Sequence, residues 1–472
     1  MIFIDTPEIS GIETTTESWA VTEFADAQLN DERRTQRLIE IATVLSEQPT
    51  ASFPEACGTK AMLKATYRFF DNPEVDPQEI LASHHEATSD RITSVDRVLA
   101  VQDTTELNFT HHKNTKDIGP LSGKNQQGLL AHTTLAITPE RVPLGIIDQQ
   151  VWARDPDQVG IKATRKKRPI SQKESYKWLK SLGAVIELSC AHPDTHFVSI
   201  GDREADIYDL FAQTRPQNVD WLVRAAWNRC VAHPEKYLWT TIEKKPIATT
   251  ITVEIPRRGN QPARQATLAV RFGSVELCPP RHRAAQHLPT ITVWAVQAME
   301  VSPPDGVEPV EWLLLTSCEI VTLSDAIERL DWYGCRWGIE ILHKILKSGC
   351  RIESRQLETG DRLRRCLPVF SVISWRILYA TMLARVLPDA PCTAILEADE
   401  WQALYCRIHQ TQTLPDKIPP LREAVHWIAR LGGFLDRTGD GDPGTTVIWK
   451  GFSHLTEITV MYCILRPTIS PG

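Results

Sequence analysis

Several signatures that would assign a chemistry at once are missing from this sequence of 472 residues. Its eleven cysteines are scattered singly, with no Cys-x-x-Cys pair. That pattern argues against a structural zinc site and a disulfide framework, and it favours a reducing compartment. There is no Walker loop, no Gly-x-Gly-x-x-Gly after a strand, no His-Glu-x-x-His and no Gly-x-Ser-x-Gly. The usual nucleotide-binding, zinc-protease and serine-hydrolase patterns are therefore excluded.

Long apolar runs and a basic leader are lacking as well. We expect no segment to approach the roughly 18 apolar residues that cross a bilayer. The N-terminal segment carries acidic residues early, where a secretory signal would carry basic ones. The sequence therefore predicts a cytoplasmic protein without a membrane partner, and its length predicts two to four domains.

An excess of basic charge is also absent, since the formal net charge is −7. Residues 1–110 hold 8 Lys and Arg against 20 Asp and Glu, whereas the remainder holds 44 against 39. The stretch Lys162–Lys177 carries seven basic residues and one Glu. Such a stretch is usually a solvated loop, and its functional alternative is contact with DNA phosphates. Net charge alone neither supports nor excludes a nucleic-acid partner.

The sequence pattern changes twice along the chain. Helical periodicity and capping residues predict helices over 32–48, 59–70 and 77–89. From Val98 the chain alternates strand-like and helical segments, with a hairpin or two neighbouring strands over 128–153, which predicts an α/β layer with mixed pairing. Residues 229–320 alternate with period two and predict antiparallel strands, and the chain turns helical again after Asp325. The predicted domains are a helical 1–95, a core over 96–228, a β-rich insertion over 229–322, a closing core helix over 323–370 and a helical 371–472.

Two acids follow short apolar runs of the central region. Asp103 is predicted to end one strand and Asp202 to follow another. Taken alone, each is more often a helix cap or a turn residue than a metal ligand. If the two strands are neighbours, however, the carboxylates converge at the edge where α/β sheets build their sites. Two hard divalent cations require such oxygen ligands.

A predicted helix over 331–357 carries a polar stripe at helical spacing. The stripe is Tyr333, Arg336, Glu340, Lys344 and Lys347. The ordinary interpretation is a solvated face on which Glu340 pairs with its cationic neighbours. The other faces are apolar, which predicts a buried helix and places the stripe along a cleft. The apolar residues are Trp337, Ile339, Ile341, Leu342, Ile345 and Leu346.

These residues together resemble the insertion-sequence-four family of DDE transposases. Its Y-x2-R-x3-E-x6-K signature is met in full by Tyr333, Arg336, Glu340 and Lys347. Further matching segments span nearly the whole chain. They are LNDERRTQRL, YRFFDNP, DTT at 103–105, KES-x-KWL at 173–179, DREADI at 202–207, PAR at 262–264, WLLLTS at 312–317 and ARLGGF at 429–434. The loop over 256–262 looks shorter and less basic than the family's.

The resemblance implies an RNase H-like mixed-sheet core with an antiparallel β insertion, flanked by an N-terminal DNA-binding and a C-terminal dimerisation domain, both helical. It implies that Asp103, Asp202 and Glu340 hold two Mg²⁺ or Mn²⁺ ions. It also implies a homodimer that nicks double-stranded transposon ends, passes through a hairpin and joins the 3′ end to target DNA.

The same resemblance assigns DNA contacts. Phosphate contacts fall on Tyr333, Arg336, Lys344, Lys347 and Arg224. Trp312 matches a tryptophan that stacks near a flipped base, and a core tryptophan is an equal alternative. Matches to N-terminal DNA contacts are Arg33, Arg34 and Arg37, for which a helix-surface role is equally plausible.

Two other functions stay open at this point. One is a catalytically retired relative that only binds transposon ends or inhibits transposition. The other is an RNase H-like nuclease or resolvase that acts without strand transfer. The three acids argue against the retired relative, because a binding module has no need of metal ligands.

Overall fold

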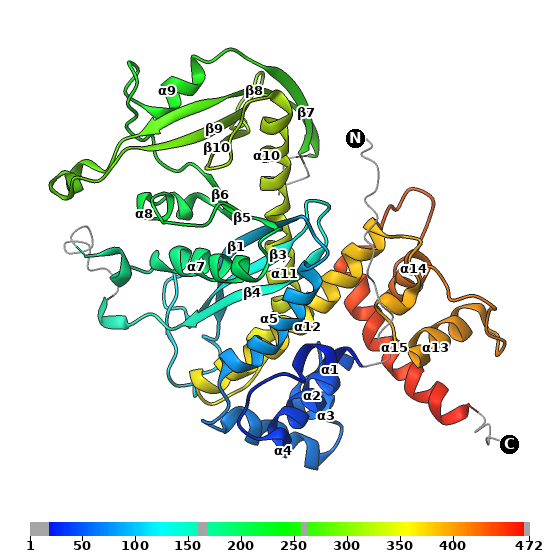
Figure 1. Ribbon diagram of the computed structural model, residues 1–472. Coiled ribbons are helices and arrows are strands. Elements are labelled where there is room, and N and C mark those ends of the chain that lie inside the picture. The colour runs from blue at the N-terminus through cyan, green and yellow to red at the C-terminus, as the bar shows by residue number, and fades with distance from the viewer. Residues whose placement is uncertain (1–17, 159–167, 256–261, 467–472) are drawn as a thin grey trace. The chain divides into compact units, whose positions relative to one another are not determined.

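The computed structural model describes residues 18–158, 168–255 and 262–466 (Figure 1). The chain forms two compact units. Unit 1 comprises Met1–Val95, Thr104–Gly160 and Gly338–Gly472, and unit 2 comprises Asp96–Asp103 and Ile161–Trp337. The chain thus passes between the units directly after Asp103 and directly after Trp337. Part of the basic stretch Lys162–Lys177 and most of the loop over 256–262 lie outside the described residues.

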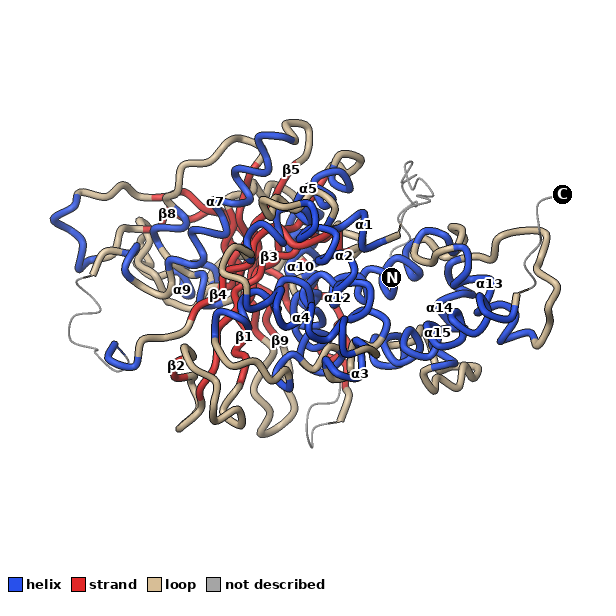
Figure 2. The backbone as a smooth tube through the Cα atoms, turned by 90° about the horizontal axis from the view of Figure 1, so that it is seen from below, coloured by secondary structure: helices blue, strands red, loops and turns tan. Residues whose placement is uncertain are grey.

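Unit 2 is built on a mixed sheet with the strand order β1-β5-β6-β10-β9-β8-β7. β1, β5 and β6 are parallel, and every pairing from β6 onward is antiparallel. The strands, red in Figure 2, are β1 (Arg97–Asn108, which runs on into unit 1), β5 (His196–Gly201), β6 (Val219–Arg224), β7 (Thr249–Ile255), β8 (Arg264–Leu277), β9 (Ile291–Glu300) and β10 (Glu311–Thr316). The predicted α/β class with mixed pairing is confirmed.

The region predicted as an antiparallel insertion extends this sheet. Its last strand, β10, pairs with β6, with Thr316 opposite Leu222. One short helix, α9 (Leu238–Glu243), falls where we predicted none. After Asp202 the chain forms a 3₁₀ turn (Arg203–Ala205) and then α8 (Tyr208–Phe211).

Helices cover the parallel strands of unit 2 because β1, β5 and β6 are largely buried on both faces, as parallel strands usually are. The Phe211 ring of α8 stacks on Trp221 of β6 with centroids 4.4 Å apart. α7 (Tyr176–Ala191) buries Trp178, which is 1 % exposed. α10 (Leu323–Cys335) buries Trp332 between the guanidinium groups of Arg97 and Arg329.

Unit 1 combines helices with the predicted hairpin, β3 (Gln127–Ile137) and β4 (Pro143–Trp152). The helices predicted over 32–48 and 59–70 are confirmed, and Asp31 and Thr59 cap them by accepting hydrogen bonds from backbone N–H groups of the following turn. The remaining elements are α1 (Trp19–Phe24), α2 (Glu32–Glu47), α3 (Phe53–Cys57), α4 (Lys60–Asp71), α5 (Pro77–Ile92), β2 (Gly119–Pro120), α12 (Gly360–Val386), α13 (Ala398–His409), α14 (Leu421–Leu431) and α15 (Thr445–Leu465).

One helix corrects the expectation that no segment is apolar enough to cross a bilayer. α12 passes that test by length and composition, with a mean hydropathy of 1.5 over its most apolar window. Within the protein, 83 % of that window is buried. Phe370 and Trp375 are among its buried side chains, and α5 and β4 are among its neighbours. α12 is therefore packed as the central helix of unit 1.

The helix predicted over 331–357 is interrupted. α10 ends at Cys335, α11 runs over Trp337–Lys344, and a π-helical turn follows over Ile345–Gly349. Arg351 then adopts a left-handed backbone with φ of 49°. Such a conformation cannot continue a right-handed helix, so the regular spacing on which we based the prediction ends earlier than predicted.

Candidate active site

Strand register sets the two candidate aspartates side by side in unit 2. The parallel pairing of β1 with β5 ends with Val101 opposite Ile200, and the same register continued by two residues sets Asp103 level with Asp202. The pairing of β5 with β6 ends with Gly201 opposite Val223, which sets Asp202 level with Arg224. Neighbouring strands lie about 4.8 Å apart. Asp103, Asp202 and Arg224 thus lie together at the carboxyl end of the parallel strands, which we call the aspartate edge.

Asp103 does not end its strand as predicted. β1 continues to Asn108, so Asp103 lies within the strand, at the point where pairing with β5 stops. The preceding Gln102 donates a hydrogen bond from Nε2 to Ser199 Oγ at 2.7 Å and ties the two strands together. Asp202 follows β5 as predicted and accepts a 2.8 Å hydrogen bond from the N–H of Glu204. It is thus both a turn residue and a candidate ligand.

Two cations accompany the aspartates. The Arg336 guanidinium lies 3.7 Å from the Asp103 carboxylate, with 16 % and 23 % of the two side chains exposed. Lys177 of α7 is 7 % exposed, and its Nζ lies 3.1 Å from Glu204 Oε2. Both cations act electrostatically on Asp202. Negatively and positively charged side chains therefore lie close together at this edge, and most of them are partly shielded from water.

Burial controls the ionisation of this group. It raises the pKa of the Asp202 carboxyl, against the opposing effects of the Glu204 N–H, Arg336 and Lys177. Burial also raises the pKa of the Tyr333 hydroxyl and lowers that of the Arg224 guanidinium. A desolvated carboxylate gains more from a bound cation than one in water does. The aspartate edge is therefore suited to a divalent ion.

Aromatic and basic side chains of unit 2 extend the site. Tyr333 is buried, and Trp312 packs edge-on against its ring at 6.1 Å while staying partly exposed. Arg224 donates from its guanidinium to the backbone carbonyl of Glu311 at 2.7 Å. Arg224, Tyr333 and Arg336 therefore lie near the two aspartates, and Trp312 packs against Tyr333.

The remaining stripe residues belong to unit 1. Glu340 lies one helical turn after Arg336 in the sequence, on α11, and is partly exposed. Lys344 is exposed, whereas Lys347 pairs at 3.9 Å with Glu353, which also accepts the Asn108 N–H. The predicted burial is confirmed for Ile339, Leu342, Ile345 and Leu346. It is wrong for Trp337, which is 61 % exposed, and Ile341 is only partly buried.

Arg33, Arg34 and Arg37 all lie in the first two turns of α2. Arg33 is 92 % exposed and pairs with Asp31 at its own helix start. Arg34 donates to the Leu29 carbonyl, and Arg37 pairs with Glu40 at 2.5 Å. All three therefore have local partners, and Arg33 offers the most accessible guanidinium.

Two residues of the site were not singled out from the sequence. Lys177 entered only as part of a basic stretch and of the matching segment KES-x-KWL, and Glu204 only as part of the matching segment DREADI. The stretch KES-x-KWL carried the first signal, since a lysine directly before the buried Trp178 sits on the covered face of its helix. Local charge counts cannot reveal that such a lysine is buried.

The donor set fits hard divalent ions. Carboxylate oxygens from two rigid, neighbouring strands are the ligands that Mg²⁺ and Mn²⁺ prefer. Raised basicity at Asp202 favours the same outcome, because a cation replaces the proton. Asp103 and Asp202 are therefore able to hold such an ion within unit 2, and a third acid would complete the coordination.

Three family models match this chain. They are Transposase DNA-binding over residues 16–75, Transposase DDE domain over 180–367 and Transposase Tn5 dimerisation domain over 372–466. Among solved structures, the cryo-EM structure of the piggyBac transposase synaptic complex with hairpin DNA matches at 9 % identity, over 96 % of this chain and 80 % of that chain. Its TM-score is 0.36, too low to carry residue roles across.

Proposed function

Because this chain is a Tn5-type DDE transposase, a metal-dependent enzyme with DNA-binding and dimerisation domains, we propose that it performs cut-and-paste transposition with Asp103, Asp202 and Glu340 as its metal ligands. The observation that carries this proposal is the register that sets Asp103 level with Asp202, beside Arg336 at 3.7 Å. Glu340 enters through the family signature, one helical turn beyond Arg336.

The proposed chemistry is phosphodiester hydrolysis followed by strand transfer. Two bound Mg²⁺ or Mn²⁺ ions would activate the attacking water or 3′-hydroxyl and steady the leaving oxygen. Asp103 and Asp202 would hold these ions from adjacent strands, and the sheet fixes the positions of the two aspartates. Arg336 and Lys177 offset the negative charge that accumulates when phosphate joins the acids.

DNA contacts follow from the groups around the aspartates. We assign contacts with phosphate oxygens to Tyr333, Arg336 and Arg224, and also to Lys344 of α11 and Lys347 of the π turn. Trp312 keeps part of its ring exposed beside Tyr333, which suits stacking on a base flipped out at a hairpin intermediate. The hairpin route is part of this proposal.

The partners are double-stranded transposon ends, target DNA and a second copy of the chain. We propose that Arg33, Arg34 and Arg37 contact the ends, and that a homodimer synapses two ends before cleavage. The protein would act in the cytoplasm, associated with the nucleoid when bound to DNA.

A cleavage and joining assay tests the proposal. Wild type and Asp202→Asn are incubated with Mg²⁺ and a duplex carrying the element's own end sequences, with supercoiled plasmid as target. Glu187→Gln, which removes an exposed carboxylate of α7 in the same unit, is the matched control. Wild type and control should nick and join, and Asp202→Asn should bind the duplex but lose cleavage by about 10³-fold or more.

Three other outcomes would contradict the proposal in different ways. Binding by wild type without nicking identifies a retired transposase. Nicking without joining identifies a nuclease or resolvase. Normal cleavage by Asp202→Asn would show that the metal-ligand assignment is wrong.

A further inference from the structure

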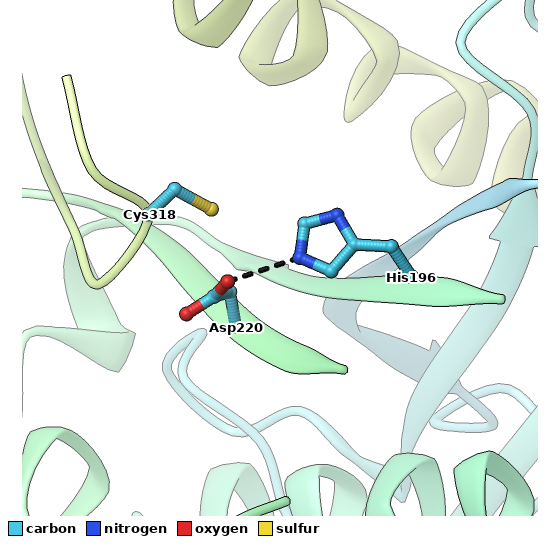
Figure 3. Close-up of side chains that lie close together, drawn as sticks. All are labelled: His196, Asp220 and Cys318. Atoms are coloured by element: carbon cyan, nitrogen blue, oxygen red, sulfur yellow. Dashed lines mark hydrogen bonds and ion pairs between the residues drawn. The ribbon is translucent and has the colours of Figure 1, made fainter. Parts of the chain in front are cut away.

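A second group of potential ligands lies in unit 2, away from the aspartate edge. His196 is the first residue of β5, Asp220 lies in β6, and Cys318 follows β10 (Figure 3). In Figure 3 the thiol and the imidazole converge on the Asp220 carboxylate. Their ligand atoms all lie within 4.8 Å of one another.

Strand pairing determines the positions of these residues, as it does for the two aspartates. β10 and β6 are antiparallel with Thr316 opposite Leu222, and continuing that register sets Cys318 opposite Asp220. His196 Nε2 lies 3.0 Å from Asp220 Oδ2. The other carboxylate oxygen accepts a 2.6 Å hydrogen bond from Ser317 and lies 3.6 Å from Arg215.

The group is separate from the proposed catalytic site. His196 and Asp202 stand at opposite ends of β5, six positions apart, which corresponds to about 20 Å along an extended strand. The side chains of His196 and Asp220 are 29 % and 19 % exposed, so solvent reaches the group from its own end of the sheet.

We propose that His196, Asp220 and Cys318 bind a zinc ion. An imidazole nitrogen, a carboxylate oxygen and a thiolate sulfur form the mixed donor set that suits this borderline ion better than the oxygen-preferring Mg²⁺. Tetrahedral zinc keeps its ligand atoms about 3.4–3.6 Å apart. The separations present, 3.0 Å for one pair and at most 4.8 Å for the others, require only small side-chain movements, and water can take the fourth position.

The charges are balanced in this arrangement. A neutral imidazole, a carboxylate and a thiolate together carry two negative charges, which the dication neutralises. Binding releases the Cys318 thiol proton to solvent. Burial raises the pKa of Cys318 to about 12, so without metal the thiol stays protonated and the His196–Asp220 hydrogen bond holds the group. The nearby Arg215 and Arg329 oppose the ion's charge and limit its affinity.

The bound ion would fix the start of the helix that leads to the catalytic site. Cys318 lies in the short connection between β10 and α10, whose N-cap is Thr322. The His196 ring also contacts Trp332 of α10, with centroids 6.4 Å apart. Zinc would therefore tie β5, β6 and this connection together, and with them the helix that carries Tyr333. Its role is structural and does not depend on the catalytic assignment above.

Cobalt substitution provides the test. Full-length metal-free protein is titrated with Co²⁺, which gives an intense thiolate-to-cobalt absorption band in the near ultraviolet and tetrahedral ligand-field bands in the visible. Wild type should show both bands at one equivalent, and Zn²⁺ should abolish them by displacement. Metal at the carboxylate site gives no thiolate band, so the signal is specific for the proposed site.

Three variants localise the signal. Cys318→Ser and His196→Ala should each weaken Co²⁺ binding by at least about 10-fold, and Cys318→Ser should lose the thiolate band. The matched control, Cys190→Ser, removes an exposed cysteine of α7 and should keep it. Circular dichroism of each metal-free variant checks that it is folded.

Stability gives a second readout. One equivalent of Zn²⁺ should raise the apparent melting temperature of wild type and Cys190→Ser but not of Cys318→Ser. A wild-type protein without a thiolate band, or a band that survives Cys318→Ser, would overturn the proposal. In the first case the group is a hydrogen-bonded cluster only, and in the second another cysteine holds the metal.

Discussion

Lys177 is a buried, positively charged residue of the proposed site. Its ammonium group is 7 % exposed and pairs with Glu204, whose side chain is 65 % exposed. The lysine stem packs beside Trp178, with Nζ 5.8 Å from the ring centroid. Because Glu204 can regain water, the ion pair itself contributes little stability. The cation matters instead through its effect on Asp202.

We expect Lys177→Met to slow cleavage by about 10-fold while leaving the melting temperature nearly unchanged. Methionine keeps the apolar stem against Trp178 but removes a positive charge that favours the Asp202 carboxylate and phosphate. Single-turnover cleavage and thermal unfolding measure the two effects. The control is Lys180→Met, which removes an exposed lysine of the same helix. Wild-type cleavage by Lys177→Met would mean that the lysine only anchors α7.

A partly buried histidine of unit 1, His85, predicts acid sensitivity. Burial, with a smaller effect from His84, lowers the pKa of His85 to about 4. An unfolded chain titrates this histidine near 6.5, so the unfolded state binds more protons between these values. The stability is fully present above about pH 6.5 and is lost as pH falls towards 4. His84, whose pKa is also lowered by burial, adds to the loss.

We expect the apparent melting temperature to fall between pH 7 and pH 5, and to fall less for His85→Asn. Over this pH range the loss of unfolding free energy due to His85 is about 2 kcal/mol. Glu23 does not contribute in this window. Burial alone would raise its pKa, but Arg91 and His84 lower it to about 2, below the range tested. Equal pH dependence in wild type and variant would exclude His85 as a source.

At the scale of elements, the turn after β5 depends on close packing at Gly201. A Cβ built on Gly201 would lie 2.4 Å from the Ala205 Cβ and 3.2 Å from a Trp178 ring atom. Both neighbours are buried, so the turn that carries Asp202 would have to move. Gly183 of α7 offers a matched contrast, because nothing lies within 4 Å of its Cβ position in the described structure.

Gly201→Ala should cost about 1–3 kcal/mol and reduce cleavage through displacement of Asp202. Gly183→Ala should be neutral or slightly stabilising, because alanine favours a helix by up to about 1 kcal/mol over glycine. Thermal unfolding and cleavage of both variants measure the difference. Equal stability and activity in the two would show that the turn tolerates a side chain.

Local sequence signals predicted the elements that are locally determined. Helical periodicity and capping residues predicted the helices over 32–48 and 59–70, and two strand-like segments on either side of residues 138–141 predicted the β3–β4 pair. The short helices α1 and α3 were missed because so few residues show no periodicity. Asp103 was placed at a strand end because the apolar run stops there, although β1 continues.

The site required information that no local pattern contains. The level positions of Asp103 and Asp202 follow from the register of strands distant in sequence. The resemblance to the DDE family supplied the residue roles, and the structure supplied the arrangement within unit 2. The absence of Cys-x-x-Cys argued against zinc, yet strand pairing brings His196, Asp220 and Cys318 together from separate segments.

At the scale of the whole molecule, the family domains and the compact units do not coincide. The DNA-binding match over 16–75 and the dimerisation match over 372–466 both fall in unit 1, whereas the DDE match over 180–367 spans both units. Within unit 1, Arg362 and Arg365 at the start of α12 bond to Asp71 and to the Val75 carbonyl. The DNA-binding segment is thus anchored to the helix on which the dimerisation segment begins.

The N-terminal part of the chain, which includes the DNA-binding match, is acidic although DNA is negatively charged. Residues 1–110 carry 8 basic against 20 acidic residues, so any phosphate contact there must come from individual cations. Arg33 is the strongest candidate of the three N-terminal arginines, with 92 % of its side chain exposed. Its pairing with Asp31 is at the surface, where an ion pair contributes little and exchanges readily for phosphate.

Salt dependence measures such a contact. Each phosphate neutralised on duplex DNA contributes about 0.9 to the slope of log affinity against log salt concentration. Arg33→Ala should therefore reduce the slope for end-sequence duplex by about 0.9 and weaken binding most at low salt. The matched control is Arg437→Ala, since Arg437 is 69 % exposed and also pairs with a nearby aspartate, Asp440. If both variants keep the wild-type slope, Arg33 is a helix-surface residue and the ends are held by other cations.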